Sequence, residues 1–186
     1  MKASALIADL TARTENNIQR AQQLREQPEA ALNRKPSPES WSALECIEHL
    51  NRYGEFYLPE IRERLGSTSH KGSGVFKSGW LGNYFAKSLM PKAKLNKMKT
   101  FSAMDPAGSS LDKTALSTFL EQQTETLELL KQARNVDLTK TKTSISISSW
   151  IKLRLGDTFR VVIYHNQRHL DQAERAVGDL VKQTGH

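Results

Sequence analysis

Residues 41–50 read Trp-Ser-Ala-Leu-Glu-Cys-Ile-Glu-His-Leu, and this stretch fixes where a long helix begins. Ser42 is followed three residues later by Glu45, the capping-box pattern in which each side chain satisfies a backbone amide group of the other residue. Trp41 before the cap and Cys46 inside the helix have the spacing of a hydrophobic staple. The stretch therefore predicts a helix that starts after Ser42.

The apolar residues that follow predict how far this helix extends. Spacings of three and four, as one face of an α-helix requires, separate the successive residues Leu44, Ile47, Asn51, Gly54, Leu58, Ile61 and Leu65. Gly66 is placed as a C-terminal cap. Pro59 removes one backbone hydrogen bond, so we expect a kink near Glu55.

Three further stretches have helical periodicity, and together the four define the fold class. The first ends at Pro28, the third covers about residues 110–134, and the fourth begins after Gly156-Asp157 and reaches about residue 183. Four long helices with apolar stripes must bury those stripes against one another. The sequence therefore predicts an all-α protein, a four-helix bundle formed by one domain over residues 1–186.

Two regions do not fit this simple pattern. Residues 67–106 form a long basic excursion between the second and third helices, with a short helix expected near residues 79–89. In residues 141–150, Ile145 and Ile147 alternate with serines, which is typical of a strand. A lone strand has no partner, so we expect an extended connection there.

The composition limits the setting and the partners. No apolar run is long enough for a membrane span, the N-terminus does not resemble a secretion signal, and Cys46 is the single cysteine. We therefore expect a cytoplasmic protein. The formal charge is +7, and one segment without acidic residues accounts for all of it. The rest of the chain has equal numbers of basic and acidic residues. That segment carries seven lysines: Lys71, Lys77, Lys87, Lys92, Lys94, Lys97 and Lys99.

Three histidines are candidate metal ligands. His165 and His169 are four residues apart on the fourth predicted helix, so both imidazoles lie on one face and can share a metal ion. His49 on the second helix can complete the set in a bundle core. The alternative is that these are hydrogen-bonded core histidines without a metal. Cys46, one turn before His49, either faces the site or is an ordinary buried thiol.

Two segments carry a resemblance to a known family. Residues 41–50, an aromatic residue and a capped helix leading to His49-Leu50, resemble the second helix of the DinB-like superfamily. Residues 164–172, Tyr-His-Asn-Gln-Arg-His-Leu-Asp-Gln, resemble its closing motif of two spaced histidines followed by glutamine. The resemblance implies a DinB/YfiT-like four-helix bundle that holds a divalent metal through His49, His165 and His169.

The same resemblance implies a class of function. Members include thiol transferases that use bacillithiol or mycothiol and maleylpyruvate isomerases that use a thiol, and many form homodimers. We therefore expect a homodimer, and we expect no membrane partner. We expect a metal-dependent enzyme, a transferase using a low-molecular-weight thiol or a hydrolase, acting on a small molecule. Zinc or nickel is the expected metal, with iron also compatible with imidazole ligands. Gln172 and Tyr53 are expected to contact the ligands or the substrate, or else simply to pack between helices.

Two other readings stay open. In one, the protein is a non-catalytic binding protein whose lysine-rich segment 71–99 and interleaved aromatic residues contact anionic partners such as nucleic acid. No familiar nucleic-acid motif accompanies the lysines, so nucleic acid is the less favoured partner, and the lysines can equally form a solvated face or steer an anionic substrate. In the other, the metal-containing bundle serves association through a dimer surface.

Overall fold

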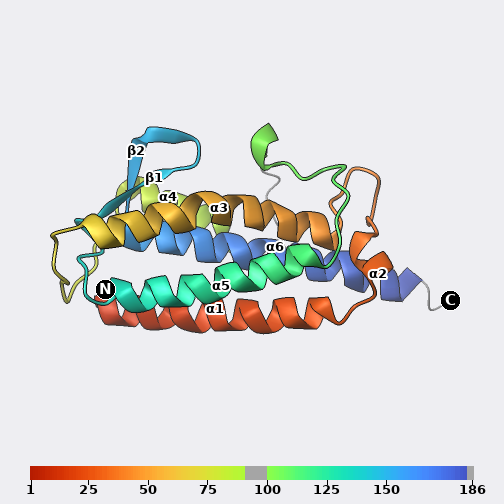
Figure 1. Cartoon of the computed structure of the whole chain (residues 1–186), viewed down its shortest axis with the longest axis horizontal. Helices are drawn as coiled ribbons and strands as arrows, with labels where there is room; N and C mark the ends of the chain where they lie inside the picture. Colours follow the sequence, from red (N-terminus) through yellow and green to blue (C-terminus); the bar gives the residue numbers. More distant parts are fainter. Residues whose placement is uncertain (91–99, 184–186) are drawn as a thin grey trace.

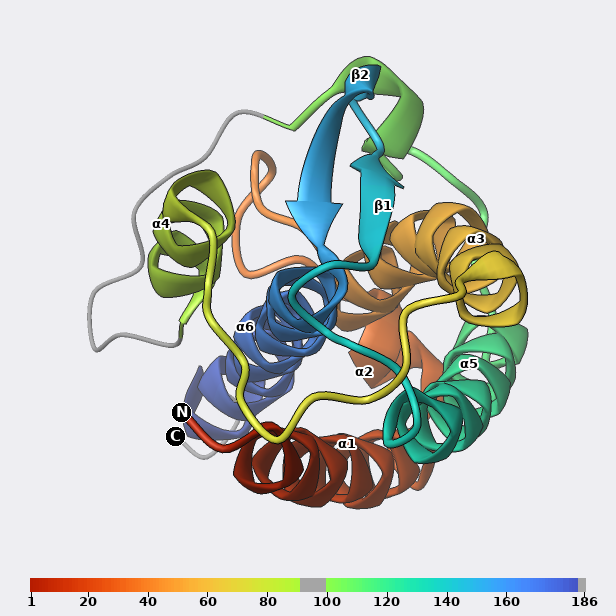
Figure 2. The same cartoon turned by 90° about the vertical axis from the view of Figure 1, so that its left-hand side faces the viewer.

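Four long helices lie side by side along the long axis of the molecule (Figure 1). The computed structural model describes residues 1–90 and 100–183. The long helices are α1 (Ala3–Arg25), α3 (Ala43–Ser67), α5 (Thr114–Ala133) and α6 (Leu155–Gln183). Helices α1 and α3 each pack against both α5 and α6, and the end-on view in Figure 2 shows the four helices around a shared interior. The prediction that the chain is mostly helical is confirmed.

The connections contain smaller elements. Within the described residues these are α2 (Glu29–Asn33), α4 (Trp80–Leu89), the 3₁₀ helix η1 (Ser102–Met104), β1 (Lys142–Ile145) and β2 (Ser148–Arg154). The short helix expected near residues 79–89 is α4. Four of the seven lysines of the basic segment lie outside the described residues: Lys92, Lys94, Lys97 and Lys99.

A polar layer divides the buried core into two apolar parts. At one end of the molecule, the core combines the first half of α1 with the last halves of α3 and α5 and the first turns of α6. At the other end, it combines the opposite halves of the same helices. The layer between them contains Asn17, Asn51, Gln123 and Asn166, all buried. Asn166 Nδ2 donates a hydrogen bond to Gln123 Oε1 (3.2 Å), which links α6 to α5 across this layer.

The expectation of an extended connection at residues 141–150 is wrong. Strand β1 pairs antiparallel with β2, with Lys142 opposite Arg154 and Ile145 opposite Ser148. The missing partner is the segment that follows directly, because a turn at Ser146 and Ile147 folds the chain back on itself. Apolar side chains of this hairpin pack against the bundle, which supplies the stability that two strands alone lack.

Two predicted helix boundaries also need correction. Gly66 does not cap α3, which continues through Ser67, and among the described residues only Gly108 has a positive φ. Helix α6 begins at Leu155, so Gly156 and Asp157 lie in its first turn rather than before it. The periodic pattern defined both helices correctly, but a single glycine or aspartate near an end did not define the terminal residue.

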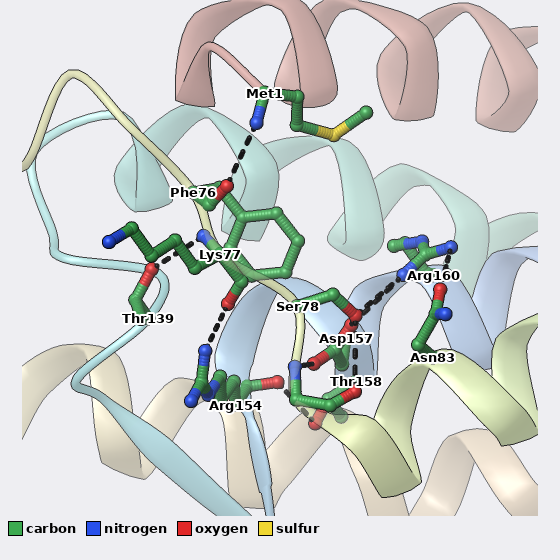
Figure 3. Close-up of polar contacts among 11 residues, drawn as sticks. Met1, Phe76, Lys77, Ser78, Asn83, Thr139, Arg154, Asp157, Thr158 and Arg160 are labelled. Carbon is green, nitrogen blue, oxygen red and sulfur yellow. Dashed lines mark hydrogen bonds and ion pairs between the residues drawn. The ribbon is translucent and has the colours of Figure 1, made fainter.

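Asp157 fastens α4 to α6 (Figure 3). Its carboxylate is fully buried and accepts hydrogen bonds from the Gly79 backbone amide (2.7 Å), from the Ser78 hydroxyl and from Arg160 (3.0 Å). Arg160 in turn donates to Asn83 Oδ1 on α4 (3.2 Å). A buried carboxylate is costly unless its oxygens are paired, and here each oxygen has a donor. The sequence pattern placed Asp157 only at the start of the fourth helix and did not predict these contacts.

The segment that leads into α4 is tied to Met1 and to β2 (Figure 3). Met1 donates from its terminal amino group to the Phe76 carbonyl (3.1 Å), and Arg154 donates to the Lys77 carbonyl (2.6 Å). The Phe76 ring is buried, and it lies so close to Gly156 that a side chain there would collide with it. These contacts place α4 beside the hairpin and α6.

No helix in residues 1–90 or 100–183 is both long and apolar enough to cross a lipid bilayer.

Two glycine-to-alanine substitutions test these assignments. A Cβ at Gly82 would lie 2.5 Å from Asp157 Cβ, so Gly82→Ala should lower the free energy of unfolding by about 1–3 kcal/mol. Gly66 lies within α3 with no neighbour within 4 Å of a new Cβ, so Gly66→Ala should raise this free energy by about 0.5–1 kcal/mol. Urea unfolding measures both; a destabilised Gly66→Ala variant would contradict the assignment of Gly66 to the helix.

Candidate metal centre

The start of α3 is held by a complete capping box. Ser42 Oγ accepts a hydrogen bond from the Glu45 backbone amide (3.1 Å), and Glu45 Oε2 accepts one from the Ser42 amide (2.8 Å). The other carboxylate oxygen of Glu45 binds the Lys35 ammonium (2.8 Å) and the Gly108 amide (3.1 Å). One buried side chain therefore joins the chain before α3 and the chain after η1 to the helix end that carries His49.

Three imidazoles from two helices converge in the polar layer. His49 comes from α3, and His165 and His169 come from successive turns of α6. The ring centroids of His49 lie 5.1 Å from His165 and 4.6 Å from His169, and the two α6 rings are 4.7 Å apart. One nitrogen from each ring lies within 4.8 Å of the other two. The structure thus brings together all three residues that the sequence analysis singled out as ligands.

The hydrogen bonds of two rings direct their Nε2 atoms towards the shared centre. His49 Nδ1 lies 2.7 Å from the Met104 carbonyl oxygen, which can only accept, so Nδ1 carries the proton. His169 Nδ1 lies 3.1 Å from Gln172 Oε1, which holds that ring in the same tautomer. A neutral imidazole protonated at Nδ1 presents the lone pair of Nε2. This is the arrangement in which a second hydrogen bond orients a metal-binding histidine.

The distance between two of these nitrogens suits a metal ion. His49 Nε2 and His165 Nε2 are 3.3 Å apart. Two nitrogens bound to one tetrahedral zinc at about 2.0–2.1 Å stand about 3.3–3.4 Å from each other. The donor set of three nitrogens also leaves a fourth position for water or substrate. The residues present therefore fit a divalent transition metal.

Burial keeps the three imidazoles neutral. Desolvation lowers the pKa of His49, although the Met104 carbonyl partly opposes this effect. Desolvation, together with the proximity of His169 and His49, lowers the pKa of His165 well below its usual value. Desolvation and His49 lower the pKa of His169 to about 3. Only neutral imidazole ligates a metal, so these shifts leave the ligands ready to bind near neutral pH.

Two aromatic side chains enclose the histidines. The Trp41 ring lies 4.7 Å from His49 and 5.8 Å from His169 between centroids. The Tyr53 ring lies 4.9 Å from His49 and 4.7 Å from His165. Burial raises the pKa of the Tyr53 phenol, so this group keeps its proton and can donate a hydrogen bond. Tyr53 and Gln172 therefore lie against the ligands, as their helical spacing predicted.

A pocket of about 150 Å³ begins at His165 and extends between α3, α5 and α6 to α4 and the hairpin. Its walls include Tyr57, Phe85, Leu89 and Leu153, and the amides of the polar layer form part of its lining. Among the residues that the structure describes, no aspartate, glutamate, lysine or arginine lines it. A cavity of this size accommodates a ligand the size of a benzene ring. Helix α4 and the hairpin thus build the far wall of the pocket.

Some residues singled out in the sequence lie elsewhere. Cys46 is fully buried in the apolar core, where desolvation raises its pKa, so it is an inert thiol and not a ligand. The described lysines of the basic segment do not line the pocket. Conversely, sequence reasoning gave Trp41 only the role of a helix staple and missed Met104. Met104 acts through a backbone carbonyl, for which residue type carries no signal.

Comparison with known proteins identifies the family. The DinB superfamily matches over residues 10–173, which include all three histidines, and the chain belongs to this superfamily. No curated protein matches the chain, and no solved structure matches it. What this particular chain does is therefore inferred from the geometry of its own site.

The buried carboxylate of Glu45 makes a pH-dependent contribution to stability. Burial opposes its charge, but Lys35 and the two backbone amides outweigh this and lower the pKa of Glu45 below 4.5. Glu45→Gln should therefore cost about 1–2 kcal/mol at pH 7. Since the folded pKa is the lower one, this difference should persist above pH 4.5 and shrink as pH falls below it.

Urea unfolding of the two proteins across this pH range measures the difference. Glu121→Gln on an exposed part of α5 is the control, and its effect should stay within about 0.5 kcal/mol. A difference between wild type and Glu45→Gln that does not change with pH would show that the charge of Glu45 does not stabilise the cap.

Proposed function

We propose that this chain binds one divalent transition metal through His49, His165 and His169 and uses it in a reaction on a small molecule. The observation that carries the proposal is the convergence of three neutral imidazoles, two of them with Nε2 atoms 3.3 Å apart, at the end of a pocket. Zinc or nickel suits this donor set, and iron is compatible with it. The scaffold is, in this proposal, a single-domain four-helix bundle of the DinB/YfiT-like type built from α1, α3, α5 and α6.

The reaction class we propose is transfer of a low-molecular-weight thiol or hydrolysis. A divalent cation held here would supply Lewis-acid chemistry and lower the pKa of a water or thiol in its open position. The protein's own groups have separate tasks. Met104 and Gln172 hold the rings of His49 and His169 in the ligating tautomer, and Trp41 and Tyr53 exclude bulk water. The Tyr53 hydroxyl keeps its proton and can donate a hydrogen bond to a bound substrate.

The lining of the pocket supports an uncharged, largely apolar substrate. Because no acidic or basic side chain of the described residues lines it, a charged substrate group would lose its hydration there without an ionic partner among them. The amides of Gln122, Gln123 and Asn166 can instead pair with a neutral polar group. Steering by the lysines does not contribute inside the pocket, because none of the described lysines reaches it.

Metal content tests the first part of the proposal. Protein purified without a polyhistidine tag should hold or take up about one equivalent of a transition metal per chain. His165→Ala should lose most of the metal affinity. His70→Ala should not, because His70 is exposed and lies beyond the C-terminal end of α3, whereas His49 lies near the start of this helix. Elemental analysis and metal titration give the measurement. Uptake below about a tenth of an equivalent by the wild type would reject the metal site.

Activity tests the second part. The metal-loaded chain is assayed with a free thiol plus 1-chloro-2,4-dinitrobenzene, an uncharged aromatic electrophile, and separately with an uncharged aromatic ester. We expect turnover above background in one assay and its loss in His165→Ala. Equal rates for the two proteins in both assays would remove the transferase and the hydrolase proposals while leaving the metal site standing.

Gln172 allows a test of ligand orientation. Gln172→Leu removes the acceptor of the His169 Nδ1 proton, so metal affinity should fall about 10–100-fold while the three ligands remain. Competition with a chelating indicator measures the affinity. Gln132→Leu on an exposed part of α5 is the matched control. Unchanged affinity in Gln172→Leu would show that this amide only packs between turns of α6.

A further inference from the structure

Two acid-free stretches of the sequence concentrate positive charge. Between Arg64 and Asp105 there are seven lysines and no acidic residue, and between Asp137 and Asp157 there are three lysines, one arginine and again no acidic residue. These eleven basic residues leave sixteen basic and twenty acidic residues for the rest of the chain. The rest is therefore net acidic, and the charge of the protein is strongly polarised.

The fold brings these two stretches together. Helix α4 lies beside β2, as Figure 2 shows, and Arg154 of β2 hydrogen-bonds the Lys77 carbonyl just before α4. The backbone of Lys71 also forms an isolated antiparallel β-bridge with Val136, which lies just before the second stretch. Six lysines of the two stretches are exposed in the described residues: Lys71, Lys77, Lys87, Lys140, Lys142 and Lys152. We call this surface of α4 and the hairpin, together with residues 71–79 and 140–141 that lead into them, the basic face.

Acidic groups next to the basic face are already paired. Asp157, which closes the second stretch, is buried against Ser78, Gly79 and Arg160. On α3, Glu60 accepts a hydrogen bond from the Ser144 amide of β1 and forms an ion pair with Arg64. Glu63 also pairs with Arg64. The acids that pack against the hairpin therefore leave its lysines largely uncompensated.

Large apolar side chains are exposed on the same two elements, α4 and the hairpin. Trp150 is 93% exposed, Trp80 is 85% exposed and Tyr84 is 62% exposed. Ile147 and Ile151 of the hairpin are also exposed. Trp150 lies in a bulge, because Ser144 pairs with Lys152 and Ile145 with Ser148, which leaves residues 149–151 without a partner on β1. A bulge redirects side chains, and here it presents an indole to solvent on a hairpin that stands above α3 (Figure 1).

From this combination we propose that the basic face docks on the surface of an anionic lipid bilayer. Lysines attract acidic headgroups, and tryptophan and tyrosine rings lie favourably at the boundary between headgroups and acyl chains. The exposed isoleucines favour lipid over nucleic acid, because an aliphatic side chain gains from the acyl region but cannot stack on a base. Ile147 also lines the pocket, so a docked bilayer would lie next to the pocket.

Vesicle binding tests the proposal on the whole 186-residue chain. Phosphatidylcholine vesicles with about 30% phosphatidylglycerol should bind the protein at least about tenfold more tightly than pure phosphatidylcholine vesicles in about 0.1 M salt. Binding should shift the tryptophan fluorescence of Trp80 and Trp150 to the blue. Phosphatidylcholine brominated on its acyl chains, included in the anionic vesicles, should quench this fluorescence, which tests insertion without any variant.

Matched variants separate the face from non-specific charge. Lys87→Glu should weaken vesicle binding several-fold, whereas Lys131→Glu on α5, the same change on an exposed lysine outside the face, should not. Trp150→Ser should weaken binding about tenfold and reduce quenching by bromolipid. Equal binding to neutral and anionic vesicles, no quenching by bromolipid, or equal effects of Lys87→Glu and Lys131→Glu would overturn the proposal. Tight binding of an oligonucleotide with no binding to anionic vesicles would also overturn it and identify a nucleic-acid surface.

Discussion

The packing of α3 against α6 in the polar layer is the constraint on which the candidate site depends. It places His49 Nε2 3.3 Å from His165 Nε2 and removes water from all three imidazoles, which lowers their pKa values. Without a metal, neutral rings gain little stability from this proximity. The lone pairs of two facing nitrogens repel each other unless a proton lies between them. A shared cation satisfies all three at once, which accounts for three buried histidines in the polar layer.

Helix α4 and the hairpin, which lie outside the four long helices, complete the pocket. Asp157 ties α4 to α6, and Arg154 ties the hairpin to the segment before α4. These two elements form the wall opposite His165, and their outer surfaces carry the lysines and exposed rings of the basic face. One side of each element therefore lines the pocket, and the other side is exposed to solvent. A change in the Asp157 contacts would affect both.

Local patterns in the sequence predicted much of this structure. The apolar periodicity located the long helices, the Ser42–Glu45 spacing located the start of α3, and the four-residue spacing placed His165 and His169 on one face. The hairpin was missed because its partner strand lies directly downstream and its inward alternation is interrupted by a bulge. Trp41 and Met104 were missed as parts of the site because their positions depend on chain segments outside the helices. The role of Asp157 depends on contacts with residues almost eighty positions away.

The central claim is that three imidazoles, one from α3 and two from α6, bind the same cation. X-ray absorption spectroscopy of the zinc-loaded protein tests this most directly, because it reports the number, type and distance of the atoms around the metal. The account predicts about three imidazole nitrogens at about 2.0–2.1 Å, together with one further light atom. A shell dominated by carboxylate oxygens, a sulfur ligand from Cys46, or a single imidazole would contradict it.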